Sequence, residues 1–362
     1  MFKKIAMILP FGILLAAAVV VFAAGNSGDP LVSFSYLNGK FSDAVDKKIE
    51  AVLDQSDADL LESVQSGEGI STKVTTWTET RLKQGDILLG NAGTNVLMLA
   101  GTGKVVYDAG AVVNVSTGKT VASGSALAVD QRYMVAEDTT AAFVIDSKTA
   151  VLDYLGEYTF AYSDKTDYNA MASALKTLHL FKGSFTGYGQ GFDLEVAPTR
   201  LQALIMFIRV LGEEEEALAW TGKIPFHDIE KGSQAEKYVG YAYSKGYTNG
   251  YTKTEFRPSA AVNAFQYTEF VLRAMGYSSA ANTSLSDTLV RAQAAGLLTE
   301  TEATRLQLEK FLRADLVYVS YYALETYLPD GERTLGDMLQ DKGVFTSSEW
   351  STASKMVSEW RI

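Results

Sequence analysis

The chain contains no cysteine and only two histidines among its 362 residues. Without cysteine it forms no disulfide, thiolate zinc site, iron–sulfur cluster or thiol nucleophile. Basic residues are also scarce, because 32 lysines and arginines stand against 43 aspartates and glutamates, for a net charge of -11. Binding to nucleic-acid phosphates needs clustered basic side chains, so this charge argues against a nucleic-acid partner.

The remaining composition is that of an exported, folded chain. A hydrophobic content of 47% and a charged content of 21% are typical of globular proteins, and the length suggests two or three domains. Residues 1–24 are predicted to be a secretory signal peptide, with a basic start, an apolar run at 5–22 and small residues after it. An uncleaved membrane anchor is the alternative, because residues 5–24 could just span a bilayer. We expect no other contact with the membrane.

The first half of the exported chain changes from helical to β-rich patterning. Residues 25–71 form a polar lead-in and an amphipathic helix, predicted over 42–64 from apolar residues at helical spacing. Residues 72–163 consist of short runs of valine, threonine and tyrosine separated by glycine-containing turns, which predicts a small antiparallel barrel or sandwich. Gly118-Lys119-Thr120 matches only the end of a phosphate-binding loop, so we interpret it as a hairpin turn.

The second half is helical and repetitive. Arg200 and Ala264 each follow a phenylalanine by eight residues and begin a predicted helix, and Arg313 begins a third helix of the same apolar pattern. A shorter helix precedes each of these, at 168–178, 235–244 and 286–295. We expect three copies that pack as one pseudo-threefold bundle at 164–328, followed by a C-terminal helical tail at 329–362. The copies have approximate bounds of 164–222, 223–278 and 279–328. The expected fold class is therefore α+β: an N-terminal helix, the β-rich domain and the all-α bundle.

The second copy carries the most specific motifs. Phe226-His227-Asp228-Ile229 lies at its start, Gly246 and Gly250 follow, and Phe256-Arg257-Pro258 precedes its second helix. These residues resemble a surface-layer homology (SLH) repeat, from a family in which three repeats bind pyruvylated secondary polysaccharides of the bacterial cell wall. The resemblance covers about 167–328 and is weakest in the third copy. The β-rich segment before it looks like the lead domain of exported proteins in Gram-positive, clostridial-type bacteria.

The resemblance implies a carbohydrate site formed by Thr199, Arg200, Arg313, Gly183 and Gly250. A pyruvyl ketal carries a carboxylate on a rigid ring, and an arginine at the start of the second helix supplies a planar donor fork for it. We also expect free backbone N–H groups and the helix dipole at this position to favour the anion. Thr199 is predicted to be the N-cap of its helix.

Structural roles compete with each of these assignments. The alternative interpretation is that the arginines are ordinary helix-start residues paired with acids such as Glu195 or Asp315. Asn263-Ala264 replaces the Thr-Arg pair in the second copy, so at most two of three sites look competent. The glycines are first of all expected to be turn residues that allow positive φ. Arg209 and Arg273 recur as well, and a structural contact suits them as well as a ligand does.

Catalytic residues, metal ligands and cofactors are not expected. His179 takes the turn position that Gly246 has in the second copy, and neither histidine has a serine or a second histidine at motif spacing. The acidic run at 213–216 is expected to be solvated surface. Glu137 and Asp138 are adjacent on a predicted strand, where they would point to opposite faces and share no acid–base task.

The sequence thus predicts an exported, non-enzymatic protein of the cell wall or surface layer. Its repeats would bind the wall polysaccharide, and its β-rich domain at 72–163 would face outward. One alternative is a wall-anchored enzyme that cleaves glycosides or remodels peptidoglycan, with its activity in 72–163. Another is an adhesin or a self-associating surface-layer module.

Overall fold

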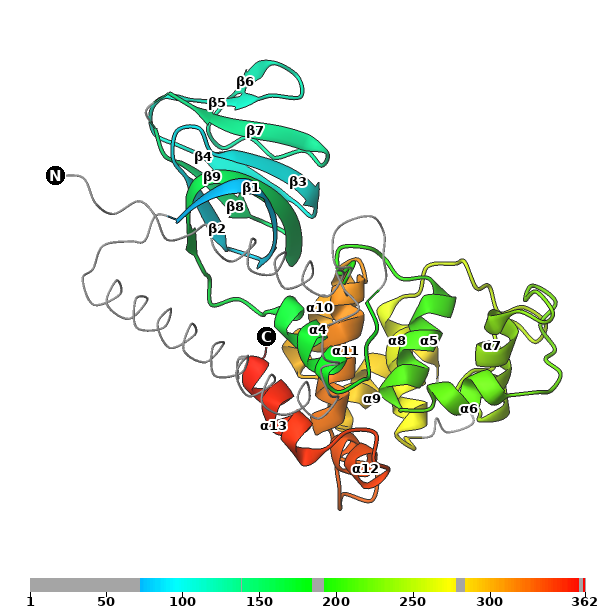
Figure 1. Cartoon of the computed structure of the whole chain (residues 1–362). Coiled ribbons are helices and arrows are strands. Elements are labelled where there is room, and N and C mark those ends of the chain that lie inside the picture. Colours follow the sequence, from blue (N-terminus) through cyan, green and yellow to red (C-terminus); the bar gives the residue numbers. More distant parts are fainter. Residues whose placement is uncertain (1–71, 138, 184–191, 278–283, 358–360, 362) are drawn as a thin grey trace, which may run out of the picture. The chain divides into compact units, whose positions relative to one another are not determined.

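A computed structural model of the chain describes residues 72–137, 139–183, 192–277, 284–357 and 361 (Figure 1). The predicted signal peptide, at 1–24, and the amphipathic helix predicted over 42–64 lie outside these residues. Within the described part, no helix is both long enough and apolar enough to span a bilayer. The described residues belong to one compact unit that contains two hydrophobic cores, one among strands and one among helices.

Nine strands of the described chain form one curled, antiparallel sheet (Figure 1). Their bounds are β1 (Thr72–Lys83), β2 (Ile87–Gly90), β3 (Asn95–Ala100), β4 (Gly103–Val106), β5 (Ala111–Asn114), β6 (Lys119–Val121), β7 (Gln131–Ala136), β8 (Ala141–Ile145) and β9 (Thr149–Ala161). The strand order is β4-β8-β2-β9-β3-β7-β5-β6, and β1 also pairs with β9. The long strand β9 therefore contacts β1, β2 and β3 and organises the sheet.

Alternation of side chains gives this sheet its core. Leu88, Val96, Val112, Phe143 and Leu152 come from five different strands and are each fully buried in one apolar cluster. Residues between such positions are only partly buried, as expected where one face of each strand is directed to a core. The prediction of an antiparallel β-rich fold combined with helices, α+β, is confirmed.

Two turns of the sheet test more local predictions. Gly118 lies in the turn between β5 and β6 with φ of +70°, so the hairpin interpretation of Gly118-Lys119-Thr120 is confirmed. The strand placement of Glu137 is wrong, because β7 ends at Ala136 and Glu137 has φ of +61° in the turn that follows. Asp138, its predicted neighbour on the strand, lies outside the described residues.

Ten α-helices and one 3₁₀-helix follow the sheet in the described chain. Their bounds are α4 (Tyr168–Thr177), α5 (Arg200–Val210), α6 (Glu214–Ala219), α7 (Gln234–Ser244), α8 (Ala264–Ala274), η2 (Leu285–Asp287), α9 (Thr288–Ala294), α10 (Glu300–Leu308), α11 (Arg313–Glu325), α12 (Leu335–Asp341) and α13 (Ser347–Met356). The three short helices predicted ahead of the apolar ones correspond to α4, α7 and α9, with ends that differ by no more than two residues.

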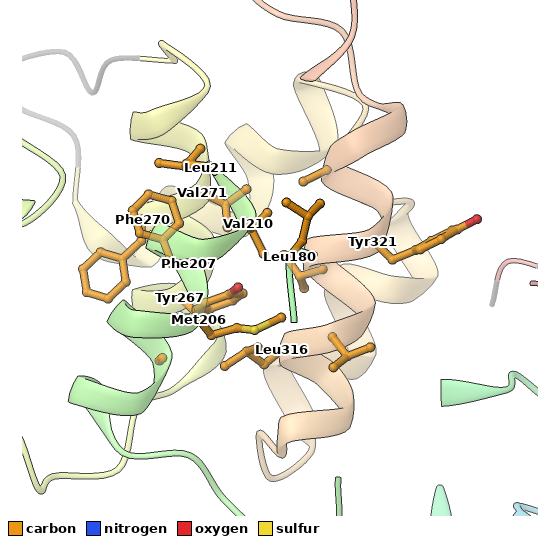
Figure 2. Packing of buried hydrophobic residues seen from close by; sticks show 14 of the residues in the cluster. Leu180, Met206, Phe207, Val210, Leu211, Tyr267, Phe270, Val271, Leu316 and Tyr321 are labelled. Carbon is orange, nitrogen blue, oxygen red and sulfur yellow. The ribbon is translucent and has the colours of Figure 1, made fainter. Parts of the chain in front are cut away.

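Helices α5, α8 and α11 contact one another pairwise and form the centre of the helical core. Figure 2 shows Phe207 of α5, Tyr267 of α8 and Leu316 of α11 in this cluster. All residues from Ala314 to Leu324 of α11 are buried, which is the pattern of a helix enclosed on every side. The hydroxyl groups of Tyr267 and Ser320 lie 2.5 Å apart, so the one polar tip of Tyr267 has a partner.

The three shorter helices α4, α7 and α9 end in the same turn. One residue beyond each C-cap has positive φ, at +63° for His179, +76° for Gly246 and +75° for Gly296. In all three turns the next residue donates its N–H over 2.9 Å to a carbonyl five residues earlier. The pairs are Leu180 to Leu175, Tyr247 to Ala242 and Leu297 to Ala292. His179 therefore occupies the turn position of Gly246, as predicted.

The C-terminal tail repeats part of this pattern. Gly343 follows α12 with φ of +73°, as Gly296 follows α9. Thr346 and Glu349 form a capping box at the start of α13, as Thr299 and Glu302 do at the start of α10. Each of these three pairs is separated by 47 positions of sequence. The segment α12–α13 thus resembles the first part of another helical copy.

This tail packs on the helices that precede it. Helix α12 contacts α11, and α13 contacts α4. Nε2 of His179 lies 3.0 Å from a carboxylate oxygen of Glu349, which joins the end of α4 to the start of α13. Arg361 donates from Nε and Nη2 to the fully buried carboxylate of Glu302, at 2.8 and 2.7 Å. The tail is therefore part of the helical fold.

Candidate functional site

Thr199 and Gln202 define the start of α5. The Thr199 hydroxyl accepts a hydrogen bond from the Gln202 N–H at 3.2 Å, and the Gln202 side chain accepts one from the Thr199 N–H at 3.1 Å. This is a complete capping box, and the prediction that Thr199 is the N-cap is confirmed. Thr199 therefore has a structural role that leaves Arg200 as the first residue of the helix.

The first backbone N–H groups of α5 already have partners. Arg200 donates its N–H to the carbonyl of Ala260 at 2.8 Å, and Leu201 donates to the carbonyl of Pro258 at 3.1 Å. Both carbonyls belong to the loop that precedes α8. The expectation of free amides that favour an anion at this helix start is wrong, because carbonyls of a loop 57 and 60 residues later in sequence accept their hydrogen bonds. An anion there would have to bind the side chain.

The Arg200 guanidinium lies against two aromatic rings. Arg200 is 3% exposed, and its Nε donates to the carbonyl of Phe256 at 2.9 Å. The guanidinium carbon lies 5.0 Å from the ring centre of Phe256 and 5.6 Å from that of Tyr251, within cation–π range. It forms no ion pair with a carboxylate in the described part of the chain, so the predicted pairing with a nearby acid is wrong for Arg200.

Tyr251 and Arg257 complete a cluster of side chains that we name the Arg200 groove, formed by Arg200, Tyr251, Phe256 and Arg257. The guanidinium carbon of Arg257 lies 3.8 Å from the ring centre of Tyr251, which is half exposed. Arg257 has φ of +60°, and Glu255 pairs with it at 3.0 Å. Two guanidinium groups thus lie within cation–π distance of the Tyr251 ring, that of Arg200 from α5 and that of Arg257 from the loop before α8.

Asp228 fixes the backbone that carries this groove. Its carboxylate accepts hydrogen bonds from the N–H groups of Phe256 at 2.9 Å and Arg257 at 2.6 Å. Burial opposes ionisation of Asp228, but these backbone hydrogen bonds outweigh it and lower the pKa of the carboxyl group. The Phe-His-Asp motif therefore holds the Phe-Arg-Pro motif in place, which explains why both belong to one sequence pattern.

Gly250 has mainly a structural part in the groove. It has φ of +82°, and a Cβ atom there would lie 2.3 Å from the ring of Phe226 and 2.5 Å from the carbonyl of Thr252. Only glycine fits this turn, and the turn positions the residue that follows it, Tyr251. Phe226 and Phe256 are buried in the helical core. Gly183 is exposed at the edge of a described segment, and no described contact joins it to Arg200.

The electrostatics of Arg200 suit an external anion. Burial lowers the pKa of Arg200, the neighbouring Tyr251 hydroxyl raises it, the second cation, Arg257, lowers it again, and the Asp228 carboxylate raises it. A guanidinium nevertheless keeps its charge at neutral pH. Because the buried Arg200 guanidinium makes no direct ion pair with a described carboxylate, a ligand that supplies a carboxylate would give it a charge-assisted hydrogen bond.

Arg313 begins α11 in the same backbone geometry. It donates its N–H to the carbonyl of Val196 at 2.9 Å, and Ala314 donates to the carbonyl of Leu194 at 3.1 Å. These carbonyls lie four and two residues after Phe192, as those of Ala260 and Pro258 lie after Phe256. The structure thus places both predicted arginines at equivalent junctions between the start of one central helix and the loop before another, but it does not bring them together.

The side-chain surroundings of Arg313 differ from those of Arg200. Its guanidinium carbon lies 5.9 Å from the Phe181 ring, and its Nε is buried without a hydrogen-bond partner. Burial lowers the pKa of Arg313, while the nearby Asp193 raises it. Asp193 has φ of +50° and holds the position that Arg257 holds in the other groove. Of the two acids considered as partners from the sequence, Glu195 also raises the pKa of Arg313, whereas Asp315 pairs with Arg305 at 2.6 Å.

The start of α8 differs from the start of α5 in more than the absence of an arginine. Asn263 caps the helix by accepting from the Gln266 N–H at 3.0 Å, and Ala264 is buried. Phe311 precedes Arg313 by two residues, whereas Phe192 and Phe256 precede Arg200 and Ala264 by eight. The segment between the phenylalanine and α11 is therefore shorter than at the other two helices, and no arginine stands at the start of α8.

The acidic run at 213–216 is a structural element, and the prediction that it is solvated is wrong for its first two residues. Glu213 accepts hydrogen bonds from the hydroxyls of Tyr241 at 3.0 Å and Tyr247 at 2.9 Å. The side chains of Glu213 and Glu214 are only 14% and 16% exposed. These carboxylates bind α7 to the segment after α5.

Glu214 also settles the role of Arg209. It accepts hydrogen bonds from Arg209 Nε at 2.8 Å, Lys182 at 2.5 Å and the Tyr238 hydroxyl at 2.7 Å. Burial opposes ionisation, but these three donors outweigh it and lower the pKa of Glu214 to about 2. Arg273 likewise pairs with Glu269 at 2.7 Å. Both recurrent arginines therefore make structural contacts.

Comparison with known proteins finds a family match in the segment where the sequence predicts the second copy. The family profile described as the S-layer homology domain matches residues 225–263. A protein named "Cell surface protein" from Thermoanaerobacter kivui is 29% identical over 201 residues, which are 53% of this chain and 25% of that protein. The matched region thus spans about a quarter of that relative's length.

Comparison with solved structures adds nothing to this. Two structures of ToxT from Vibrio cholerae O395 cover 79% of this chain and 95% and 94% of their own, at 11% and 10% identity. Their TM-scores are 0.13 and 0.12, which are too low to indicate a shared fold. The profile match, in contrast, includes Tyr251, Phe256 and Arg257. The chain therefore contains an S-layer homology domain at residues 225–263, and this domain contributes the loop that faces Arg200.

Proposed function

We propose that this protein is anchored non-covalently at the bacterial cell surface through three SLH repeats in 164–328, and that the Arg200 groove binds a pyruvylated wall polysaccharide. The observation that carries the proposal is a buried arginine that forms no direct ion pair with a described carboxylate, at the edge of an SLH domain and beside a half-exposed tyrosine and a second arginine. The T. kivui relative, by its name a cell surface protein, supports the location.

The chemistry of the groove suits an anionic sugar. The Arg200 guanidinium supplies a planar donor for a carboxylate, and Tyr251 offers a half-exposed ring face against which a sugar ring packs. The helix amides are engaged, so binding depends on the side chains. With a net charge of -11 the chain repels anionic polymers at long range, and ions screen this repulsion beyond about 8 Å at physiological salt. Anchoring therefore rests on local contacts.

The repeated geometry supports three copies of one unit. Helices α4, α7 and α9 end in the same turn, α5, α8 and α11 contact one another, and two of the junctions share their backbone hydrogen bonds. In this proposal the copies occupy about 164–222, 223–278 and 279–328. The protein is exported and non-enzymatic, and it displays the β-rich domain at 72–163 outward from the wall.

Co-sedimentation with purified wall sacculi tests the proposal. We expect the protein to pellet with native sacculi and to stay in solution with sacculi from which the polysaccharide has been chemically stripped. The double variant Arg200→Ala/Arg257→Ala should remain soluble with native sacculi while its thermal unfolding stays cooperative. Equal pelleting on native and stripped sacculi would refute polysaccharide anchoring.

A further inference from the structure

The sheet contains an open pocket far in sequence from the SLH domain. Its volume is about 740 Å³, within the range of small-molecule sites. Three turns and strand β9 line it, namely the turns after β2, β4 and β7. The lining residues are Asn91, Ala92, Asp108, Ala109, Thr139, Thr140 and Glu157. The pocket therefore gathers loops that the strand order brings to one end of the sheet.

Hydrogen bonds between these turns hold the pocket in shape. The Thr139 hydroxyl donates to the carbonyl of Ala109 at 2.6 Å, and the Thr140 hydroxyl donates to Oδ1 of Asn91 at 3.1 Å. The Asn91 N–H donates to the carbonyl of Glu157 at 3.1 Å. Each turn is thus tied to another part of the wall, and a ligand would meet a preformed surface.

The lining side chains define the chemistry of a ligand. Apart from two alanines, all carry a hydroxyl, amide or carboxylate group, and no lysine, arginine or aromatic residue is among them. Asp108 is exposed and forms no ion pair with a residue in the described ranges. Such a surface fits a hydroxyl-rich molecule with a positive charge, because hydroxyls and amides exchange hydrogen bonds with it and a carboxylate binds a cation.

The size of the pocket distinguishes a sugar from a metal ion. Its volume is many times the share of about 30 Å³ that one water occupies in the liquid. The described residues include no group of three or more histidine, aspartate or glutamate side chains that could hold a metal ion. We propose that this pocket binds a saccharide that carries a free amino group, with Asp108 as the partner of its ammonium.

Titration calorimetry of the full chain tests this proposal. The probe is a glucosamine tetramer, and the N-acetylglucosamine tetramer is its uncharged match. We expect the glucosamine tetramer to bind more tightly than its acetylated match, and Asp108→Asn to weaken that binding at least about tenfold, because a charge-assisted hydrogen bond is lost. Added salt should weaken the binding as well.

Asp146→Asn is the matched control. Asp146 lies beyond the opposite end of β8 from Thr140, and its carboxylate pairs with Lys104 at 3.1 Å on the exposed surface. We expect this variant to bind as the original chain does. Equal binding of both tetramers, absence of binding, or an unchanged affinity in Asp108→Asn would each overturn the proposal. The proposal would also be overturned if calorimetry detected binding of Ca²⁺ but no binding of the glucosamine tetramer.

The wall-anchoring proposal and the pocket proposal can be refuted independently of each other. Arg200→Ala should leave the affinity for the glucosamine tetramer unchanged, because its groove and the pocket share no residue. A chain that pellets with sacculi but ignores the tetramer would overturn only the pocket proposal.

Discussion

Arg200 and Arg313 occupy the same backbone position but different chemical surroundings. Each is the first residue of a central helix and donates its N–H to a loop of another copy. Arg200 then meets an exposed tyrosine and a second arginine, whereas Arg313 meets Phe181 and the carboxylate of Asp193. The comparison teaches that the helix start gives the arginine its position, and that the residue after the loop phenylalanine, Arg257 in one case and Asp193 in the other, changes the charge beside it.

Replacement of Arg200 should have the largest effect on wall binding. Arg200→Ala removes the unpaired guanidinium and should lower the affinity for native sacculi at least about tenfold, since a charge-assisted hydrogen bond is lost. Sedimentation isotherms measure this. Arg333→Ala is the control, because Arg333 is an exposed arginine whose ion pair with Asp341 is weak at 3.4 Å. If both variants bind equally, Arg200 is not part of the site.

Replacement of Arg257 by the residue of the other groove should have the next largest effect. Arg257→Asp puts a carboxylate where Asp193 stands, at a positive φ that aspartate tolerates. We expect about five- to tenfold weaker binding, because the new charge repels the ligand and pairs with Arg200. Pelleting at low and high salt checks the result. A loss that does not shrink at high salt would contradict the electrostatic explanation.

Replacement of Tyr251 should have a moderate effect. Tyr251→Ala removes the ring that lies 3.8 Å from the Arg257 guanidinium and should weaken sacculus binding about threefold. Tyr251→Phe keeps the ring and should retain most of the affinity. If Tyr251→Phe binds as weakly as Tyr251→Ala, the hydroxyl rather than the ring face contacts the ligand.

Replacement of Arg313 should have the smallest effect on binding. Asp193 raises the pKa of Arg313 and offsets its charge, so Arg313→Ala should change the affinity for sacculi by less than about twofold. The melting temperature should be measured in parallel, because Nε of Arg313 is buried. A loss as large as that of Arg200→Ala would show that the two grooves bind alike.

Local features of this fold were predictable from the sequence. Thr199 and Gln202 form their capping box within one turn, and the turn at His179 depends on residues within five positions. The sequence also indicates a helix start in the C-terminal tail, because Thr346 and Glu349 repeat the spacing of Thr299 and Glu302. Such features depend on neighbours in the chain, so a pattern of residues is enough to predict them.

Features made by distant residues were not predictable. The amides at Arg200 appear free in sequence, and only the fold shows that a loop 60 residues later occupies them. Glu213 appears solvated until Tyr241 and Tyr247 are placed beside it, 28 and 34 residues away. Arg257 was visible in the Phe-Arg-Pro motif, but its distance to the Tyr251 ring depends on a turn with positive φ.

The backbone hydrogen bonds from Arg200 to Ala260 and from Leu201 to Pro258 make the groove a composite of two half-sites. One half-site holds Arg200, outside the matched domain at 225–263, and the other holds Tyr251 and Arg257 within it. If the proposed binding holds, the number of complete grooves is set by the junctions between one central helix and the loop before another. A fragment that holds only residues 225–263 carries one half-site and lacks the donor supplied by the preceding copy.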